Sequence, residues 1–415
     1  MPISPKIYRS VLPNGMVLVT EPNPRHRAIA LGFWVKHGSR SEHIQEHGGA
    51  HFVEHLLFKG TKTRTPLQIA KEIEAVGGEL NAFTSRETTC YHTELLGTDL
   101  SVALNIFEDI LVNSTFPPEE VERERQVILE EIKMYDDTPD ELVIDLLYEN
   151  FFPDQAFGRP VLGTKQSISS LTRKQLWSIY KGTHTPDQLI VTGAGAVDHD
   201  RLGKELSRRF LGRGSPYSPP EVKITHASKQ RSFTKPIEQV HVAIGYPTVP
   251  FADPQRYALR LLNVYLGHGM GSQLFQKVRE EKGLAYSVFS SLNLHHHTGL
   301  MLFYVGTSRV HEIRCLKTIQ NVIDDVREKG IPKDSLDLTK KRLVGILQLA
   351  AEDPEDRMNS IGQQELYVQQ AQPLEEEIEK IWGTSKEEVR AAAETLFSSA
   401  ETKITVGPKR AKSKK

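Results

Sequence analysis

The apolar and polar positions of the first half of the chain predict strands that alternate with helices. Short apolar runs between turn residues indicate strands, and apolar positions that recur every three or four residues indicate helices. An Asn-Gly pair at 14–15 predicts the turn of a hairpin over 7–21. The further elements expected are strands at 28–35, 80–95 (one strand or a hairpin) and 188–197, and helices at 65–76, 99–114, 121–136, two within 140–180, and 200–210.

A similar series of elements follows residue 232. Between the two series, residues 213–232 are polar and rich in glycine, serine and proline, which is typical of a linker. The chain therefore divides into a domain at 1–212 and a second domain at 233–415, which ends in a basic tail at 409–415. In the second domain, strands are expected at 239–246, 285–294 and 300–307, and helices at 254–267, 274–282, 311–329 and from 332 to about 352.

The match between the two series indicates an internal repeat of about 210 residues. Residues 67–85 align with 274–291, and Phe116-Pro117 aligns with Ile331-Pro332. Because strands precede helices in each half, the expected fold class is α+β. We expect two homologous domains, each a largely antiparallel sheet with helices packed on one face.

Candidate metal chemistry is concentrated at 51–55, which read His-Phe-Val-Glu-His. In a helix, His51 and His55 lie one turn apart on one face, as a pair of zinc ligands requires. Glu54 borders the same face, where it can act as a general base toward the attacking water. This order is the inverse of the common His-Glu-x-x-His motif, which is absent from the chain.

A third ligand is expected from the helix at 121–136. Glu124 and Glu131 are seven residues apart and share a face of that helix. We predict that Glu131 completes a His-His-Glu site for one Zn²⁺ per chain, and that Glu124 holds a ligand histidine by its second ring nitrogen. Glu130 is the alternative ligand, although it is rotated about 100° around the helix from Glu131.

The internal repeat predicts that the second half carries no metal. To within one residue, it aligns the three candidate ligands with Ala258, Leu262 and Ile346. None of these side chains can bind zinc, so the second half is expected to keep the fold without the metal.

Five stretches of the sequence together carry a family resemblance: Gly-Gly-Ala-His at 48–51 through Phe-Lys-Gly-Thr at 58–61, Asn-Ala-Phe-Thr-Ser at 81–85, the pair Glu124 and Glu131, Phe-Gly-Arg-Pro at 157–160 through Gly163-Thr164, and 279–286. In this order they resemble the pitrilysin-like M16 metallopeptidases, which are inverzincins. The nearest likeness is to short bacterial members similar to the beta subunit of the mitochondrial processing peptidase. The resemblance implies a zinc peptidase with the LuxS/MPP-like metallohydrolase fold.

The resemblance also implies roles for four more residues. Asn81 and Ala82 are similar to the family's substrate-binding edge strand, which pairs with an extended peptide. Arg279 and Tyr286 are similar to a pair that contacts the substrate backbone and the tetrahedral intermediate. The alternatives are an ordinary strand covered by its neighbours and two surface residues that flank the turn at Gly283. In the family, the metal domain faces a second-half domain of a partner chain, so we expect a homodimer, or a heterodimer with a related chain, whose sites are completed in trans.

Composition and charge narrow the functional classes. The chain of 415 residues has a formal net charge of −1, which argues against a broad nucleic-acid footprint. Its two cysteines, Cys90 and Cys315, suit a reducing compartment. No apolar run is long enough to span a membrane, and the N-terminus lacks the apolar core of a secretory signal. We expect a cytoplasmic protein, although a removed import presequence would leave no trace.

These patterns predict a zinc-dependent endopeptidase that acts on unfolded peptides or presequence-like segments, with Glu54 activating the water. The competing class is a non-catalytic subunit or scaffold of the same family, which binds peptides or proteins without cleaving them. The intact set of His51, Glu54, His55 and Glu131 favours the enzyme.

Overall fold

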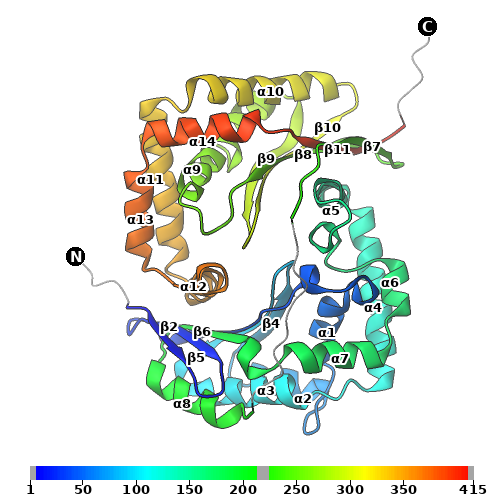
Figure 1. Cartoon of the computed structure of the whole chain (residues 1–415), viewed down its shortest axis with the longest axis vertical. Coiled ribbons are helices and arrows are strands. Elements are labelled where there is room, and N and C mark those ends of the chain that lie inside the picture. The colour runs from blue at the N-terminus through cyan, green and yellow to red at the C-terminus, as the bar shows by residue number, and fades with distance from the viewer. Residues whose placement is uncertain (1–5, 213–223, 410–415) are drawn as a thin grey trace. The chain divides into compact units, whose positions relative to one another are not determined.

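The computed structural model describes residues 6–212 and 224–409, which form two compact units. The first unit contains residues 6–134, 159–212 and 348–375, and the second contains 135–158, 224–347 and 376–409. Each unit is built on one sheet, and both faces of that sheet are covered by helices (Figure 1). The expected α+β class with two domains is therefore confirmed.

The sheet of the first unit has the strand order β1-β2-β6-β3-β5-β4. β2 and β6 pair in parallel, and the other neighbours pair antiparallel. β3 is central and buried on both faces, which explains its uninterrupted apolar sequence. The strands are β1 (Tyr8–Val11), β2 (Val17–Pro22), β3 (Ala28–Val35), β4 (Glu79–Thr84), β5 (Thr89–Leu96) and β6 (Leu189–Gly195).

One face of this sheet packs against seven helices from the first half of the chain. Their apolar stripes meet in a core that includes Phe33 of the sheet and Phe52 and Phe107 of the helices. The helices are α1 (Gly49–Leu57), α2 (Pro66–Glu74), α3 (Leu100–Asn113), α4 (Pro118–Asp137), α6 (Lys165–Ser170), α7 (Arg173–Thr183) and α8 (His199–Arg209).

The opposite face of the first sheet is covered by α12 (Pro354–Val368), which comes from far along the sequence (Figure 1). Met358 and Ile361 of α12 pack against Trp34 in a second, smaller core. Glycine at position 32 permits this close approach, because a Cβ atom there would lie 2.4 Å from Sδ of Met358.

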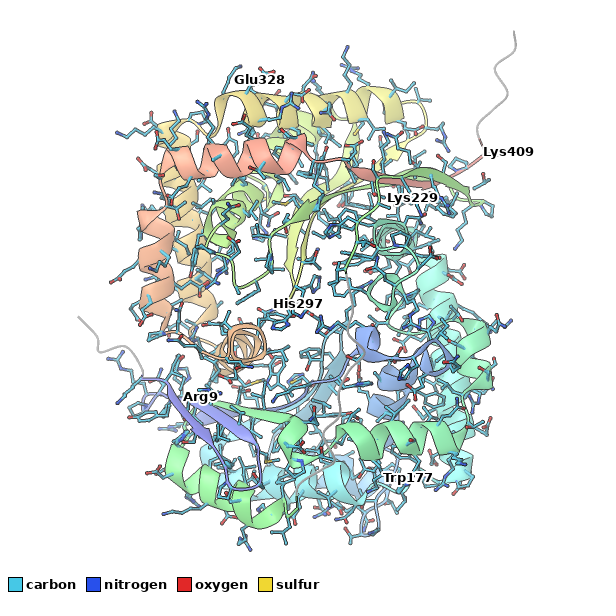
Figure 2. All side chains as sticks on the ribbon, in the orientation of Figure 1. Arg9, Trp177, Lys229, His297, Glu328 and Lys409 are labelled. Carbon is cyan, nitrogen blue, oxygen red and sulfur yellow. The ribbon has the colours of Figure 1, made fainter. Side chains whose placement is uncertain are left out.

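Two arginine–glutamate pairs hold α12 on the sheet. The helix supplies the arginine of one pair and the glutamate of the other. Arg357 of α12 pairs with Glu21 of β2, and both side chains are only 8% exposed. Arg9 of β1, labelled in Figure 2, pairs with Glu365 of α12 at 2.9 Å. Arg357 lies near the start of α12 and Glu365 lies near its end. The two pairs therefore attach both ends of the helix to the sheet, one to β2 and the other to β1.

The sheet of the second unit has the order β7-β11-β8-β10-β9. This order matches β2-β6-β3-β5-β4 of the first sheet, and its one parallel pair, β7 with β11, falls where β2 pairs with β6. The strands are β7 (Gln230–Thr234), β8 (Gln239–Thr248), β9 (Ala285–Leu294), β10 (Gly299–Ser308) and β11 (Thr402–Gly407). Its helices are α5 (Pro139–Phe151), α9 (Arg256–Gly267), a π-helix (Phe275–Glu280), α10 (Glu312–Lys329), α11 (Lys333–Ala350), α13 (Leu374–Gly383) and α14 (Lys386–Ser398).

The structure differs from the expectation of helices on one face of each sheet. α5 follows α4 along the chain, yet it packs on the second sheet, where Leu147 joins a core with Ala243 and Leu302. α12 follows α11 and packs on the first sheet. The two halves of the sequence therefore exchange one helix each, because each sheet has a second apolar face that its own half leaves uncovered.

Other differences concern single elements. The expected pair of helices within 140–180 is three helices, α5, α6 and α7, and the helix expected at 274–282 is the shorter π-helix. The domain boundaries at 212 and 233 do not anticipate the helix exchange, and much of the linker at 213–232 lies outside the described residues. Within the described part of the chain, no helix combines the length and the apolar character that a membrane span needs.

Candidate metal centre

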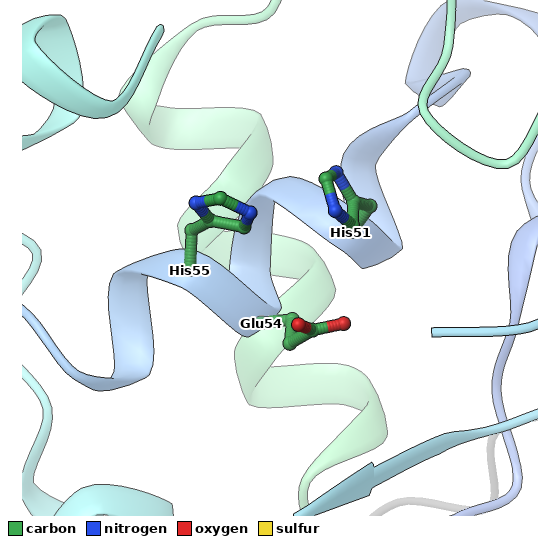
Figure 3. A group of neighbouring side chains, drawn as sticks. All are labelled: His51, Glu54 and His55. Atoms are coloured by element: carbon green, nitrogen blue, oxygen red, sulfur yellow. The ribbon is translucent and has the colours of Figure 1, made fainter. Parts of the chain in front are cut away.

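Helix α1 carries His51, Glu54 and His55 and is almost wholly buried. Phe52 and Leu56 project from its apolar side into the main core of the first unit, which leaves the two histidines on another side. Figure 3 shows both imidazole rings projecting from the same side of the helix, with the Glu54 side chain on the adjoining side, below the ribbon in this view. Ligand atoms of these three residues all lie within 4.8 Å of one another.

Glu131 of α4 reaches both imidazole rings. Its Oε2 atom lies 3.8 Å from Nε2 of His51 and 3.8 Å from Nε2 of His55. Donor atoms at about 2.0–2.1 Å from a tetrahedral zinc lie roughly 3.3 Å apart, so each of these two separations is only slightly longer than the spacing around one ion. Glu130 instead pairs with Lys133, and its side chain is 70% exposed. The donor set and its spacing therefore fit Zn²⁺, with Glu131 and not Glu130 beside the histidines.

The protonation state of His51 also suits a metal. Burial, together with the neighbouring His55, lowers the pKa of His51 to about 3, so its imidazole is neutral and can donate a lone pair. Burial raises the pKa of Glu131, and His55 acts against this shift. Nδ1 of His51 is buried and has no hydrogen-bond partner among the residues that the structure describes.

His55 is held from its other side by Glu124. Nδ1 of His55 lies 3.1 Å from Oε2 of Glu124, and Nζ of Lys59 lies 2.9 Å from Oε1 of the same carboxylate. Burial acts to raise the pKa of Glu124. The hydrogen bonds with His55 and Lys59 act to lower it and together outweigh burial, so the pKa of Glu124 lies below its ordinary value. An ionised Glu124 keeps the proton of His55 on Nδ1, which leaves Nε2 free to bind a metal beside Glu131.

Glu54 is positioned from the sheet. Thr84, the last residue of β4, donates its hydroxyl hydrogen to Oε2 of Glu54. Burial raises the pKa of Glu54, while Thr84 and His55 act against the shift and Glu131 adds to it. A raised pKa brings this carboxylate closer to the proton affinity that a general base needs near neutral pH.

Asn81 and Ala82 lie on β4, which ends the described sheet and pairs with β5 alone. Asn81 is exposed and Ala82 is half-buried. Since Thr84 of the same strand contacts Glu54, this sheet edge runs to the candidate centre. β4 is therefore the edge strand of the described sheet, while its pairing with a substrate stays a prediction.

Arg279 and Tyr286 belong to the second unit, where they contact each other. The Arg279 guanidinium lies 4.6 Å from the centre of the Tyr286 ring and 4.7 Å from that of Phe275. Nη1 of Arg279 also donates to the backbone oxygen of Tyr286 at 3.0 Å. Tyr286 is 77% exposed, so its ring is accessible within its own unit.

Three further residues that support this centre are not indicated by the sequence. Lys59 and Thr84 lie inside stretches of family resemblance, but no spacing rule indicates their contacts with the two glutamates. Glu42 accepts hydrogen bonds from the backbone N–H groups of Gly48 and Ala50 at the start of α1. An acid at this distance before a helix carries no recognisable capping pattern, because capping residues normally lie at the helix boundary.

Comparison with protein-family models gives two consecutive matches. Residues 17–165 match the family described as Insulinase (Peptidase family M16), and residues 170–343 match the family described as Peptidase M16 inactive domain. The first match contains all the candidate ligands, and the second covers the half in which the repeat predicts none.

Relatives and solved structures agree with these matches. A Mycobacterium tuberculosis protein described as an uncharacterized zinc protease is 38% identical over 406 residues, which cover 96% of this chain and 93% of the relative. A Bacillus subtilis protein with the same description is 33% identical over 97% of this chain and 98% of the relative.

The crystal structure of a protease from Helicobacter pylori shares the fold with a TM-score of 0.91 at 22% identity, over 98% of this chain and 100% of that chain. A Pseudomonas fluorescens structure described as a peptidase M16 inactive domain aligns with a TM-score of 0.88 at 19% identity, over 98% of this chain and 99% of that chain. With its fold, its cluster of His51, Glu54, His55 and Glu131, and its relatives in agreement, the chain belongs to peptidase family M16.

Proposed function

We propose that this chain is a zinc-dependent endopeptidase that hydrolyses peptide bonds in unfolded peptides or presequence-like segments. One observation carries the proposal: Oε2 of Glu131 lies 3.8 Å from Nε2 of both His51 and His55, and Glu54 lies beside these histidines. The description of its relatives as zinc proteases supports the same reading.

The reaction divides among these residues. His51, His55 and Glu131 would hold one Zn²⁺ per chain. When bound, zinc supplies Lewis acidity, which lowers the pKa of a water toward about 7 and polarises the substrate carbonyl. Glu54 takes a proton from the water as the water oxygen bonds to the carbonyl carbon. It then delivers that proton to the amine nitrogen as the C–N bond breaks.

The free edge of β4 supports an extended substrate. A peptide that pairs with Asn81 and Ala82 through its backbone lies along a strand whose last residue, Thr84, contacts Glu54. Backbone pairing makes little demand on side chains but requires an unpaired segment of chain. We therefore infer that unfolded segments are cleaved and that folded proteins are not.

Arg279 and Tyr286 are assigned to the same reaction in a dimer. We propose that the pair of one chain contacts the substrate backbone and the developing oxyanion at the metal centre of a second chain. A mixture of Glu54→Gln and Arg279→Ala chains would then regain activity once subunits exchange. Absence of activity after exchange has been verified by mass would contradict assembly in trans.

The proposed compartment is the cytoplasm. Cys90 and Cys315 are both free and buried, which is compatible with a reducing environment.

The function is tested by cleavage of an unstructured peptide library with wild type and Glu54→Gln, with zinc measured on the same preparations. We expect zinc in both proteins and cleavage by wild type alone. Zinc in both proteins without cleavage by either would favour the binding subunit or scaffold. Cleavage by Glu54→Gln at the wild-type rate would remove Glu54 from the mechanism.

A further inference from the structure

Glu42 lies outside the candidate metal centre but is bonded to the helix that carries it. Its side chain is buried, with 2% of the residue exposed. Oε2 accepts a hydrogen bond from the N–H of Gly48 at 2.9 Å, and Oε1 accepts one from the N–H of Ala50 at 2.7 Å. Both oxygens of one carboxyl group are therefore used on the first turn of α1.

The first turn of α1 has no cap of its own. A helix begins with N–H groups that lack intrahelical partners, and a side chain of the N-cap residue normally accepts one of them. The N-cap here is Gly48, which has no side chain and adopts a left-handed conformation with φ of 86°. Glu42 supplies the acceptor that this glycine cannot.

The glycine is required by the neighbouring loop. A Cβ atom at Gly48 would lie 2.8 Å from the backbone oxygen of Leu162 and 2.9 Å from Cα of Gly163. The same loop also holds Glu42 in place, because Nη2 of Arg159 donates to the Glu42 backbone oxygen at 2.6 Å. The loop thus excludes an ordinary capping residue and fixes the residue that replaces it.

The contact with Ala50 lies next to a candidate ligand. His51 follows Ala50 directly, and its Nδ1 has no hydrogen-bond partner among the described residues. His55, in contrast, is oriented by Glu124. The position of the His51 ring therefore depends mainly on the backbone of this first turn, whereas a side chain helps to fix the His55 ring.

We propose that Glu42 is a positioning residue, which fixes the first turn of α1 so that Nε2 of His51 meets the metal together with His55 and Glu131. The proposal rests on the zinc site of the proposed function. Glu42 acts through the helix backbone and touches neither the metal nor the substrate.

The test uses the full-length chain freed of metal, with the zinc dissociation constant measured by competition with a chromophoric chelator. Glu42→Gln keeps the size of the side chain but replaces one acceptor oxygen with an NH₂ group, which cannot accept from an N–H. Glu46→Gln is the matched control, since Glu46 lies four residues on, accepts a hydrogen bond from the N–H of His43, and has the smallest of the effects on the pKa of Glu42. We expect the dissociation constant to rise at least tenfold in Glu42→Gln, the scale found for groups that orient ligands, and less than twofold in Glu46→Gln.

A second readout separates positioning from general stability. The visible absorption of the Co²⁺-loaded protein reports ligand geometry, and we expect it to change in Glu42→Gln and not in Glu46→Gln. A lower melting temperature with an unchanged dissociation constant and unchanged Co²⁺ spectrum would overturn the proposal. Glu42→Asp retains a carboxyl group but is too short to reach both N–H groups, and it should weaken zinc binding in the same direction. If neither Glu42 variant folds, the residue serves the fold as a whole and the proposal fails.

The result for wild type distinguishes a failure of the proposed function from a failure of the positioning role. Wild type that binds no zinc contradicts the proposed function itself. Wild type that binds zinc no more tightly than Glu42→Gln contradicts only the positioning role.

Discussion

Glu124 and His55 form a hydrogen-bonded pair, with Oε2 of the carboxylate 3.1 Å from Nδ1 of the ring. The pair turns Nε2 of His55 toward Glu131 and holds its proton on Nδ1. Lys59 binds the same carboxylate at 2.9 Å and favours its ionised form. The zinc affinity of this centre should therefore depend on a residue that does not touch the metal.

Glu124→Gln is expected to weaken zinc binding by about 10- to 100-fold, because a neutral amide orients His55 less firmly and lowers its basicity. The dissociation constant from chelator competition measures this effect. Glu119→Gln, an exposed acid on the same helix, is the control and should leave the constant unchanged. Equal constants for wild type and Glu124→Gln would show that the pair does not tune the metal.

Thr84→Val tests the placement of Glu54. Valine has nearly the shape of threonine but cannot donate to the carboxylate, so Glu54 loses the contact that aims it from β4. We expect kcat for peptide cleavage to fall at least tenfold with zinc content and KM unchanged, since general-base catalysis contributes about 10²–10⁴-fold. Thr93→Val makes the same change at a buried residue whose hydroxyl donates to the backbone oxygen of Glu79. A similar loss in both variants would point to the sheet and not to Glu54.

The candidate ligands can be predicted from the sequence more completely than the residues that support them. His51, Glu54 and His55 lie within one helical turn, so local geometry alone brings them together, and the seven-residue spacing selects Glu131 over Glu130. The contacts of Glu42, Lys59 and Thr84 arise from tertiary packing between separate elements, and no periodicity reports such packing. These three residues are therefore absent from the sequence-based site.

The strands of the first sheet are largely predictable, because apolar runs and an Asn-Gly turn mark them directly. In the second sheet β8, β9 and β10 are predicted, but β7, which begins within the expected linker, and β11 are not. The exchange of α5 and α12 is not predictable, since an amphipathic helix shows that it has an apolar face but not which sheet will cover that face. The helix α12 itself lies beyond the last predicted helix, which ends at about 352. The glycine at position 32 and the pair of Arg357 with Glu21 specify the partner of α12. Neither feature indicates this contact until the positions of α12 and the sheet are known.

The Arg357–Glu21 pair gives a stability prediction for the exchanged helix. Arg357→Met leaves the Glu21 carboxylate buried without its partner, which should lower the free energy of unfolding by about 3–5 kcal/mol. Adding Glu21→Gln to Arg357→Met removes the unpaired charge and should recover most of that loss. Urea unfolding measures both variants. A double variant as unstable as Arg357→Met would mean that the arginine contributes by packing and not by charge.

The buried His37 predicts a loss of stability in acid. Burial lowers its pKa from the ordinary 6.5 to about 4, and the residue is 4% exposed. The unfolded chain therefore takes up this proton at a higher pH than the folded chain, and the free energy of unfolding should fall as pH drops from 6.5 toward 4. The slope from one proton approaches about 1.4 kcal/mol per pH unit. His37→Gln should reduce the slope measured in this range, whereas an unchanged slope would show that His37 does not contribute.

The most direct test of the central claim is zinc content by inductively coupled plasma mass spectrometry, after dialysis, for wild type, Glu131→Gln and Glu130→Gln. The two variants make the same change at adjacent positions of α4, one beside the histidines and one paired with Lys133 at the surface. We predict one zinc per chain in wild type and Glu130→Gln, and a large loss in Glu131→Gln. Full zinc in Glu131→Gln, or no zinc in wild type, would contradict the assignment of His51, His55 and Glu131 as the metal ligands.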